Sequence, residues 1–323
     1  MSAITILGAG VAGLSVAWEL ASRGVCPKII DPAPGSNSCS WWAGGMLAPF
    51  CEGETAAAPV VRLGQGAATW WQAAGAHVTQ AGTLVVALGR DRQELDRFAR
   101  RTSGHRLVDA DELGALEPDL AGRFPKALHF EGEAHLAPRD ALATLRANLE
   151  TKGIKVTPEG PHSGTIIDCR GLSARDSLPA LRGVRGEMAI LRAPGIALHR
   201  PVRLLHPRHP LYIVPRGDGV HMLGATQIES DGRGPATLRS VVELLNAAYA
   251  LHPAWAEAEV LEIGADARPA FPDNLPRITR QITHQGDRIH VNGLFRHGFL
   301  LAPALARMTA DLVLDGAQPE FLQ

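Results

Sequence analysis

The first residues of the chain combine a strand-like apolar run with a helical pattern. Residues 3–7 read AITIL, an apolar and β-branched run that predicts a buried strand. Apolar residues then recur at helical spacing and predict a helix over residues 11–23. Residues 28–31 predict a second short strand, which ends before Pro32. This order within about thirty residues is typical of a βαβ unit.

The pattern changes again further along the chain. Helices are predicted over residues 67–74, 92–101 and 138–152, and short strands over residues 154–156 and 164–168. Between residues 183 and 270, strand-like runs predominate and are interrupted by one helix over residues 238–251, which predicts an antiparallel sheet with a helix on it. A strand over residues 288–291 and a final helix over residues 303–314 complete the pattern.

A glycine-rich turn connects the first predicted strand to the first predicted helix. Residues 8–13 read GAGVAG, and Asp31 ends the next strand. In this context Gly8 permits a tight turn, Gly10 lets a pyrophosphate approach the backbone, and Gly13 lets the helix pack closely on the sheet. Asp31 can accept hydrogen bonds from ribose hydroxyls. The pattern favours a dinucleotide site over a turn with incidental glycines, and it leaves NAD and FAD open.

Together these patterns predict an α/β protein made of two interleaved domains. A Rossmann-like dinucleotide-binding domain is expected over residues 1–75, 138–180 and 280–323. An inserted α+β substrate domain with an antiparallel sheet is expected over residues 76–137 and 181–279.

Composition excludes several classes of protein. The formal net charge of −1 gives no basic excess for binding nucleic acid. The four cysteines form no C-x-x-C pair, and no H-E-x-x-H pattern occurs, so we expect reduced thiols and no metal. No apolar run reaches the roughly 18 residues of a membrane span, and the first residues lack a basic start, so we expect a cytoplasmic protein.

Several segments resemble the FAD-dependent D-amino-acid oxidase and glycine oxidase family, and within it the glycine oxidases of thiamine biosynthesis. They are GAGVAG with Asp31, AGGMLAP at residues 43–49, YIVPR at residues 212–216 with LGAT at residues 223–226, ARPAFPDNLP at residues 267–276, and NGLFRHGFLLAP at residues 292–303. They follow the order of the family and extend along the whole chain.

The resemblance implies that the dinucleotide is FAD. No cysteine follows Cys169, so the last flavin segment has no thiol for a covalent link, and we expect noncovalent binding. The implied cofactor-binding residues are Gly8, Gly10, Val11, Ala12, Gly13, Asp31, Ser40, Gly44, Gly45, Met46, Leu294, Arg296, His297, Gly298, Phe299 and Leu300.

The resemblance also implies a substrate site. Arg268 matches the arginine that binds the substrate carboxylate, Tyr212 matches an active-site tyrosine, and the backbone carbonyl of Arg296 is an acceptor for the substrate amine. A guanidinium can hold a carboxylate through two parallel hydrogen bonds. Trp41 and Trp42 either cover the site or fill the core beside it.

The implied activity is oxidative deamination of glycine or another small amino acid to the imine. Dioxygen would take the electrons and give hydrogen peroxide, and the imine would supply thiamine thiazole synthesis. Alternatives are a sarcosine or D-amino-acid oxidase, a dehydrogenase of the same family, a non-catalytic flavin-binding subunit and, least favoured, an NAD-linked dehydrogenase. Relatives are often homo-oligomers, but no heptad or apolar stripe specifies one here.

Overall fold

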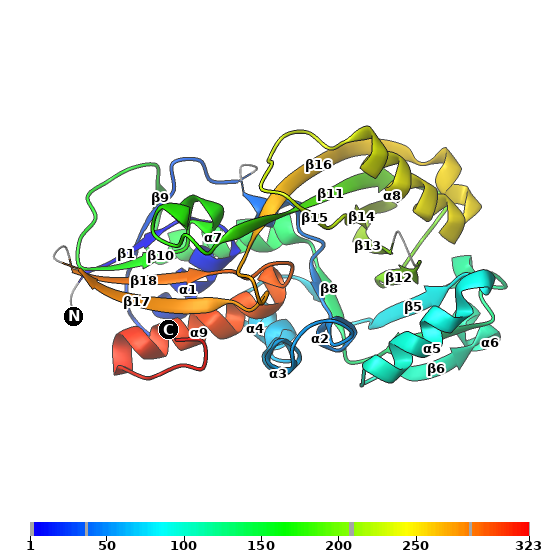
Figure 1. Cartoon of the computed structure of the whole chain (residues 1–323), viewed down its shortest axis with the longest axis horizontal. Coiled ribbons are helices and arrows are strands. Elements are labelled where there is room, and N and C mark those ends of the chain that lie inside the picture. The colour runs from blue at the N-terminus through cyan, green and yellow to red at the C-terminus, as the bar shows by residue number, and fades with distance from the viewer. Residues whose placement is uncertain (1–2, 36–37, 207–209, 284–285, 323) are drawn as a thin grey trace.

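The computed structural model describes residues 3–35, 38–206, 210–283 and 286–322. Two large sheets lie side by side, one of six strands and one of nine, and β8 (Ala134–Leu136) of a small three-stranded sheet lies between them (Figure 1). The small sheet is formed by β3 (Met46–Leu47), β8 and β4 (Val78–Thr79).

The six-stranded sheet has the order β17-β18-β10-β1-β2-β9. Its strands are β1 (Ile4–Leu7), β2 (Lys28–Ile30), β9 (Val156–Thr157), β10 (Thr165–Asp168), β17 (Arg277–Thr283) and β18 (Gly286–Asn292). All neighbours pair in parallel except β17 and β18. The predicted domain boundary between residues 279 and 280 falls inside β17, so a boundary ahead of this strand would keep the sheet whole.

Helices pack against the six-stranded sheet and bury a large apolar core. The helices of this half are α1 (Val11–Ser22), α3 (Ala58–Gly64), α4 (Ala67–Ala73), α7 (Pro138–Thr151) and α9 (Gly298–Asp315). The short helix α2 (Pro49–Glu52) instead contributes Cys51 to a core cluster of the other half. Figure 1 shows α1 and α9 lying together beneath this sheet, and both helices contribute to the same core. The two ends of the chain therefore meet around the βαβ unit.

Helix α9 begins five residues earlier than the sequence predicts, at Gly298 instead of Pro303. Proline is common in the first turn of a helix, which is why its position suggested a helix start. Inside a helix, proline leaves the carbonyl four residues earlier without a donor. Here that carbonyl belongs to Phe299, and it accepts a hydrogen bond of 2.8 Å from the indole Nε1 of Trp71. Trp71 thus replaces the missing amide.

The nine-stranded sheet forms the other half of the molecule. Its strands are β5 (Thr83–Ala87), β6 (Arg106–Asp109), β7 (Lys126–Phe130), β11 (Arg182–Arg192), β12 (Val202–Leu205), β13 (Leu211–Gly217), β14 (Val220–Gly224), β15 (Ile228–Glu229) and β16 (Glu259–Ala270). The strands of this sheet pair antiparallel, as expected, except that β12 and β5 pair in parallel. The long pair β11 and β16 is antiparallel along its whole length.

Three helices accompany this sheet: α5 (Arg92–Arg101), α6 (Ala110–Leu116) and α8 (Leu238–Leu251). Helices α5 and α8 have the predicted bounds. At the start of α6, the Asp109 side chain accepts a hydrogen bond from the amide of Glu112 and caps the helix. None of the helices in the described residues combines the length and hydropathy of a bilayer span.

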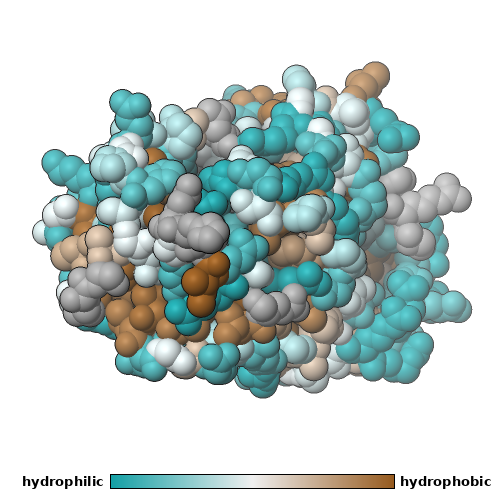
Figure 2. Space-filling view, turned by 60° about the vertical axis from the view of Figure 1, so that its left-hand side comes forward, coloured by the Kyte–Doolittle hydropathy of each residue, from teal (hydrophilic) through white to brown (hydrophobic). Residues whose placement is uncertain are grey.

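The surface carries scattered large hydrophobic side chains. In the view of Figure 2, hydrophobic residues gather in patches in the lower half, among hydrophilic ones. The two most exposed large hydrophobic side chains are Ile282 of β17 and Leu238 of α8, which belong to different halves of the molecule. Isolated exposed hydrophobic residues are normal on protein surfaces.

Candidate functional site

A cavity of about 1190 Å³ is lined by residues of both large sheets. The carboxyl ends of β1, β2, β10 and β18 contribute Gly8, Asp31, Arg170 and Asn292 to its wall. The nine-stranded sheet contributes side chains from β11, β13 and β16. Ligands bind at the carboxyl ends of strands in open α/β sheets, so this cavity is the candidate site.

The start of α1 forms one end of the cavity. The amide of Val11 donates to Ser40 Oγ at 3.1 Å, and a Cβ at Gly10 would lie 3.3 Å from the same oxygen. Asp31 lies at the end of β2, where its carboxylate accepts from the amide of Ala9 at 2.7 Å. The backbone amides of a helix start favour a phosphate, and glycine at position 10 keeps the approach to them open.

Gly13 does not line the cavity, but it explains how α1 reaches its position. A Cβ at this residue would overlap with the carbonyl oxygen of Gly8. The backbone of the glycine-rich segment and the backbone of the first turn of α1 are therefore in direct contact. Gly8 itself has a φ of 95°, in the left-handed region that favours glycine.

Tyr212 of β13 occupies a slot that two glycines leave open. A Cβ would lie 2.7 Å from Tyr212 Cε2 if placed on Gly44, and 2.5 Å from Tyr212 Oη if placed on Gly224. Gly224 is the cross-strand partner of Tyr212 in β14. Burial raises the pKa of the Tyr212 phenol, while the nearby Arg268 charge acts in the opposite direction. The phenol is therefore a hydrogen-bond donor at neutral pH.

Arg216 ties the strand that carries Tyr212 to the AGGMLAP segment. Its Nη2 donates to the carbonyl of Gly44 at 2.7 Å, and its Nη1 donates to the carbonyl of Leu136 at 3.1 Å. Burial lowers the pKa of Arg216 to about 10, so the guanidinium is still charged at neutral pH. These bonds fix Gly44 against the Tyr212 ring.

Arg268 of β16 presents its guanidinium to the cavity. Its Nη1 donates to the carbonyl of Thr226 at 3.3 Å. Among the described residues, no carboxylate oxygen lies within 4.0 Å of its nitrogens. Burial lowers the pKa of Arg268, and the adjacent Tyr212 opposes this shift. A partly buried cation with spare donors is suited to an anionic ligand.

The Glu52 carboxylate lies close to two arginine side chains and one histidine side chain at the cavity wall. Its Oε2 lies 2.8 Å from Arg296 Nε and 2.9 Å from His297 Nε2, and its Oε1 lies 3.6 Å from Arg203 Nη1. Burial disfavours the ionised form, but these partners outweigh it and hold the pKa of the Glu52 carboxyl well below its usual value. The Arg296 side chain thus forms an ion pair with Glu52.

His297 and Trp42 line the cavity, whereas Trp41 lies outside its lining. His297 is buried, and its Nε2 lies 2.9 Å from Glu52 Oε2. Trp42 lines the cavity and lies against Gly264 of β16, where a Cβ would overlap with the indole. Trp41 instead packs under Arg139, whose Cζ lies 4.4 Å from the ring centroid. The same Arg139 Cζ lies 5.1 Å from the Trp42 centroid, so Arg139 contacts both indoles, but only Trp42 faces the cavity.

The cavity collects nearly all of the residues that the sequence points to. Apart from Gly13, every predicted site residue lines it, including Ala12, Gly45, Met46, Leu294, Gly298, Phe299 and Leu300. Glu52 and Arg203 also line the cavity and were not predicted. Glu52 follows the AGGMLAP segment by three residues and could have been considered, whereas Arg203 carries no local signal. Within the described residues, no group of three or more potential ligands could hold a metal, and all four cysteines are free thiols.

Comparison with known proteins gives a consistent result. The model of the FAD dependent oxidoreductase family matches residues 3–312. The chain is 55% identical over 326 residues to a putative thiamine biosynthesis oxidoreductase ThiO of Rhizobium etli, covering 98% of each chain. It is 27% identical to a glycine oxidase of Pseudomonas aeruginosa, covering 98% of this chain and 95% of the relative.

A solved structure has a similar fold. The crystal structure of glycine oxidase from Geobacillus kaustophilus superposes with a TM-score of 0.81 at 20% sequence identity, covering 99% of this chain and 96% of the other. This similarity extends over both large sheets.

Proposed function

The chain belongs to the family of FAD-dependent oxidoreductases, and from this premise we propose that it oxidises glycine or another small amino acid to the imine. FAD is the cofactor of this family, and when bound it accepts the two electrons that leave the substrate. The imine would supply thiamine thiazole synthesis or hydrolyse to the oxo acid and ammonia. Dioxygen would be the electron acceptor and would become hydrogen peroxide. A cytoplasmic location stays a prediction.

The residues of the cavity suit FAD. Gly10 leaves the start of α1 accessible, Asp31 is placed at the end of β2, and Gly298 opens α9 at the same cavity. The first amides of a helix have no acceptor within the helix itself, so these two helix starts favour negative charge, as a pyrophosphate and a reduced flavin would supply. We infer that Gly8–Ala12 hold the pyrophosphate, that Asp31 binds ribose, and that the 43–46 and 294–300 segments hold the flavin noncovalently.

The substrate assignment rests on one observation: beside the Tyr212 phenol, the Arg268 guanidinium has no carboxylate partner within the described part of the chain. In this proposal Arg268 binds the substrate carboxylate through paired hydrogen bonds, and the Tyr212 hydroxyl donates a further one. The backbone carbonyl of Arg296 accepts from the substrate amine. The Arg296 side chain takes no part, because Glu52 already holds it.

The test is an anaerobic half-reaction of the purified yellow protein with glycine, sarcosine, D-alanine and D-proline, followed by admission of air and assay of peroxide. We expect glycine or another of the four to bleach the flavin. Arg268→Ala should retain FAD and raise the substrate concentration needed by about 100-fold or more, since hydrogen bonds to charged groups contribute about 1.5–3 kcal/mol each.

Arg192→Ala is the matched control. Arg192 lies on the same strand pair, and its exposed side chain binds Glu259 at 3.1 Å, away from the cavity. Its variant should behave as the parent protein does. Normal bleaching by Arg268→Ala would exclude the carboxylate clamp, and a protein bleached by none of the four compounds would exclude the proposed substrates.

A further inference from the structure

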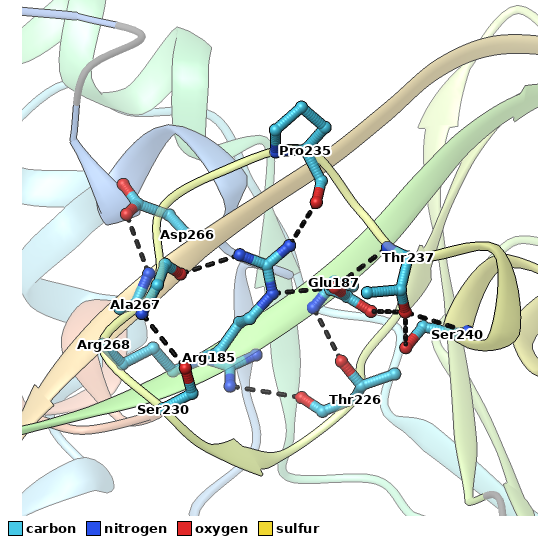
Figure 3. Close-up of polar contacts among 11 residues, drawn as sticks. Arg185, Glu187, Thr226, Ser230, Pro235, Thr237, Ser240, Asp266, Ala267 and Arg268 are labelled. Atoms are coloured by element: carbon cyan, nitrogen blue, oxygen red, sulfur yellow. Dashed lines mark hydrogen bonds and ion pairs between the residues drawn. The ribbon is translucent and has the colours of Figure 1, made fainter.

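The side chain of Arg268 crosses a neighbouring strand to reach the backbone carbonyl of Thr226. Arg268 belongs to β16, which pairs along one edge of β11, whereas Thr226 lies at the other edge of β11. The guanidinium nevertheless donates to the Thr226 carbonyl at 3.3 Å. Figure 3 shows the side chain extending from its own strand toward Thr226. The charged group therefore lies over the backbone of β11.

Gly186 is the residue of β11 that makes this crossing possible. Gly186 pairs with Asp266, and Arg268 pairs with Val184, two residues before Gly186. Position 186 and the Arg268 side chain are therefore diagonal neighbours on the same face of the sheet. A Cβ on Gly186 would overlap with Cζ and both Nη atoms of Arg268, and these are its nearest neighbours. The φ of Gly186 lies outside the left-handed region. Glycine is therefore needed for space and not for backbone conformation.

The acceptor at the far edge is fixed by the residue that follows Gly186. The Glu187 amide donates to Thr226 Oγ1 at 2.9 Å, and the Thr226 amide donates to the Glu187 carbonyl at 3.2 Å. The Glu187 carboxylate is fully buried and accepts from Arg185 Nε at 2.7 Å and from the Thr237 amide at 3.2 Å. Figure 3 shows this network around Glu187. The Thr226 carbonyl thus has little freedom to follow a displaced guanidinium.

We propose that Gly186 is a positioning residue that sets the reach and direction of the Arg268 guanidinium. This inference rests on the proposed function of Arg268. Its physical content is separate, because Gly186→Ala keeps the charge and the hydrogen-bond donors of Arg268 and changes only where they lie. The displaced guanidinium loses its hydrogen bond to the Thr226 carbonyl. It also leaves the position and orientation that bidentate carboxylate binding requires.

The test compares carboxylate binding to the holoenzymes of variants. Acetate, a carboxylate without an amine, is titrated while the flavin absorbance is followed, and kcat and KM are measured with the amino acid that bleaches the parent enzyme. Gly186→Ala should weaken acetate binding and raise KM by about 10-fold or more, with kcat changed much less, because hydrogen bonds to charged groups are lost. FAD content should equal that of the parent protein. Gly195→Ala is the control, since a Cβ there meets nothing within 4 Å, and it should match the parent.

The double variant Gly186→Ala/Arg268→Ala separates positioning from a general structural role. If Gly186 acts through Arg268, the double variant binds acetate as weakly as Arg268→Ala alone. A Gly186→Ala protein that fails to fold while the double variant folds also supports the proposal, because removing Arg268 then relieves the overlap. Unchanged acetate binding in Gly186→Ala, a further loss in the double variant, or failure of both to fold would overturn it. Unchanged acetate binding in Arg268→Ala would instead refute the proposed function.

Discussion

The two large sheets line one cavity by different means. At the six-stranded sheet the wall is largely backbone, with Gly8 and Gly10 leading into α1 and Asp31 on the next strand. At the nine-stranded sheet it consists of side chains, chiefly Tyr212 and Arg268, from strands far apart in sequence.

The difference explains why the first region is read easily from sequence and the second is not. A backbone cradle needs glycines at fixed spacing in one short segment, so its signal is local. A side-chain cluster needs only that distant strands become neighbours, which no local pattern records. We therefore expect substitutions at the first region to remove the cofactor, and those at the second to change substrate binding alone.

The largest effect is expected for Gly13→Val, at the six-stranded sheet. Any Cβ at residue 13 overlaps with the Gly8 carbonyl, so α1 must move away from β1. We expect loss of bound FAD and a lower melting temperature, measured by the ratio of flavin to protein absorbance and by thermal unfolding. Gly89→Val is the control, because a Cβ at Gly89 has no neighbour within 4 Å. A Gly13→Val protein with full FAD would mean that the cradle does not depend on close packing.

An intermediate effect is expected at Glu133, which directly precedes β8 of the small sheet. Its buried Oε1 accepts from the Cys51 amide at 2.7 Å, and burial raises its pKa from 4.5 to about 7. Between these values the folded protein keeps a proton that the unfolded chain has lost, so stability falls as pH rises. At about 1.4 kcal/mol per pH unit the loss reaches ~3 kcal/mol above pH 7.

Glu133→Gln, which keeps the shape without the charge, should therefore stabilise the protein at pH 8 by up to ~3 kcal/mol and have little effect near pH 4.5. Urea unfolding of both proteins at the two pH values measures this. Asp96→Asn, at an exposed ion pair with Lys126, is the control and should lack the gain at pH 8. Equal stability of Glu133→Gln and the parent at pH 8 would show that the carboxylate is not desolvated.

The smallest effect is expected for Tyr212→Phe, at the nine-stranded sheet. Phenylalanine fills the same slot between Gly44 and Gly224, and only the hydroxyl is lost. We expect KM to rise about 5-fold, corresponding to roughly 1 kcal/mol for one hydrogen bond, with FAD content unchanged. Tyr249→Phe is the natural control, because the other tyrosine is exposed on α8. Loss of FAD from Tyr212→Phe would contradict the separation of the two regions.

How far the sequence predicts the structure depends on whether its signal is local. The βαβ unit and α8 follow from periodicity and have bounds within a residue of those expected. The start of α9 was misplaced because the donor to the Phe299 carbonyl is Trp71, far away in sequence. The parallel pairing of β12 with β5 was also missed, since nothing in residues 202–205 identifies their partner.

The candidate site divides in the same way. Arg268 and Tyr212 were found through resemblance and not through periodicity. Arg203 was missed because its relation to Glu52 exists only after folding, when the two side chains lie 3.6 Å apart. Gly186 shows the limit most clearly, because a glycine in a strand has no evident purpose until the side chain lying over it is known.

The order of strands in the six-stranded sheet also bears on how the protein acquires its cofactor during synthesis. β1 pairs with β10, and β10 pairs with β18, so the centre of the sheet joins segments from the beginning, middle and end of the chain. Long loops must close before such pairings form, which makes folding slow. The ribosome must release residues 286–292 before the sheet is complete, although GAGVAG emerges first. Flavin capture is therefore expected to follow translation.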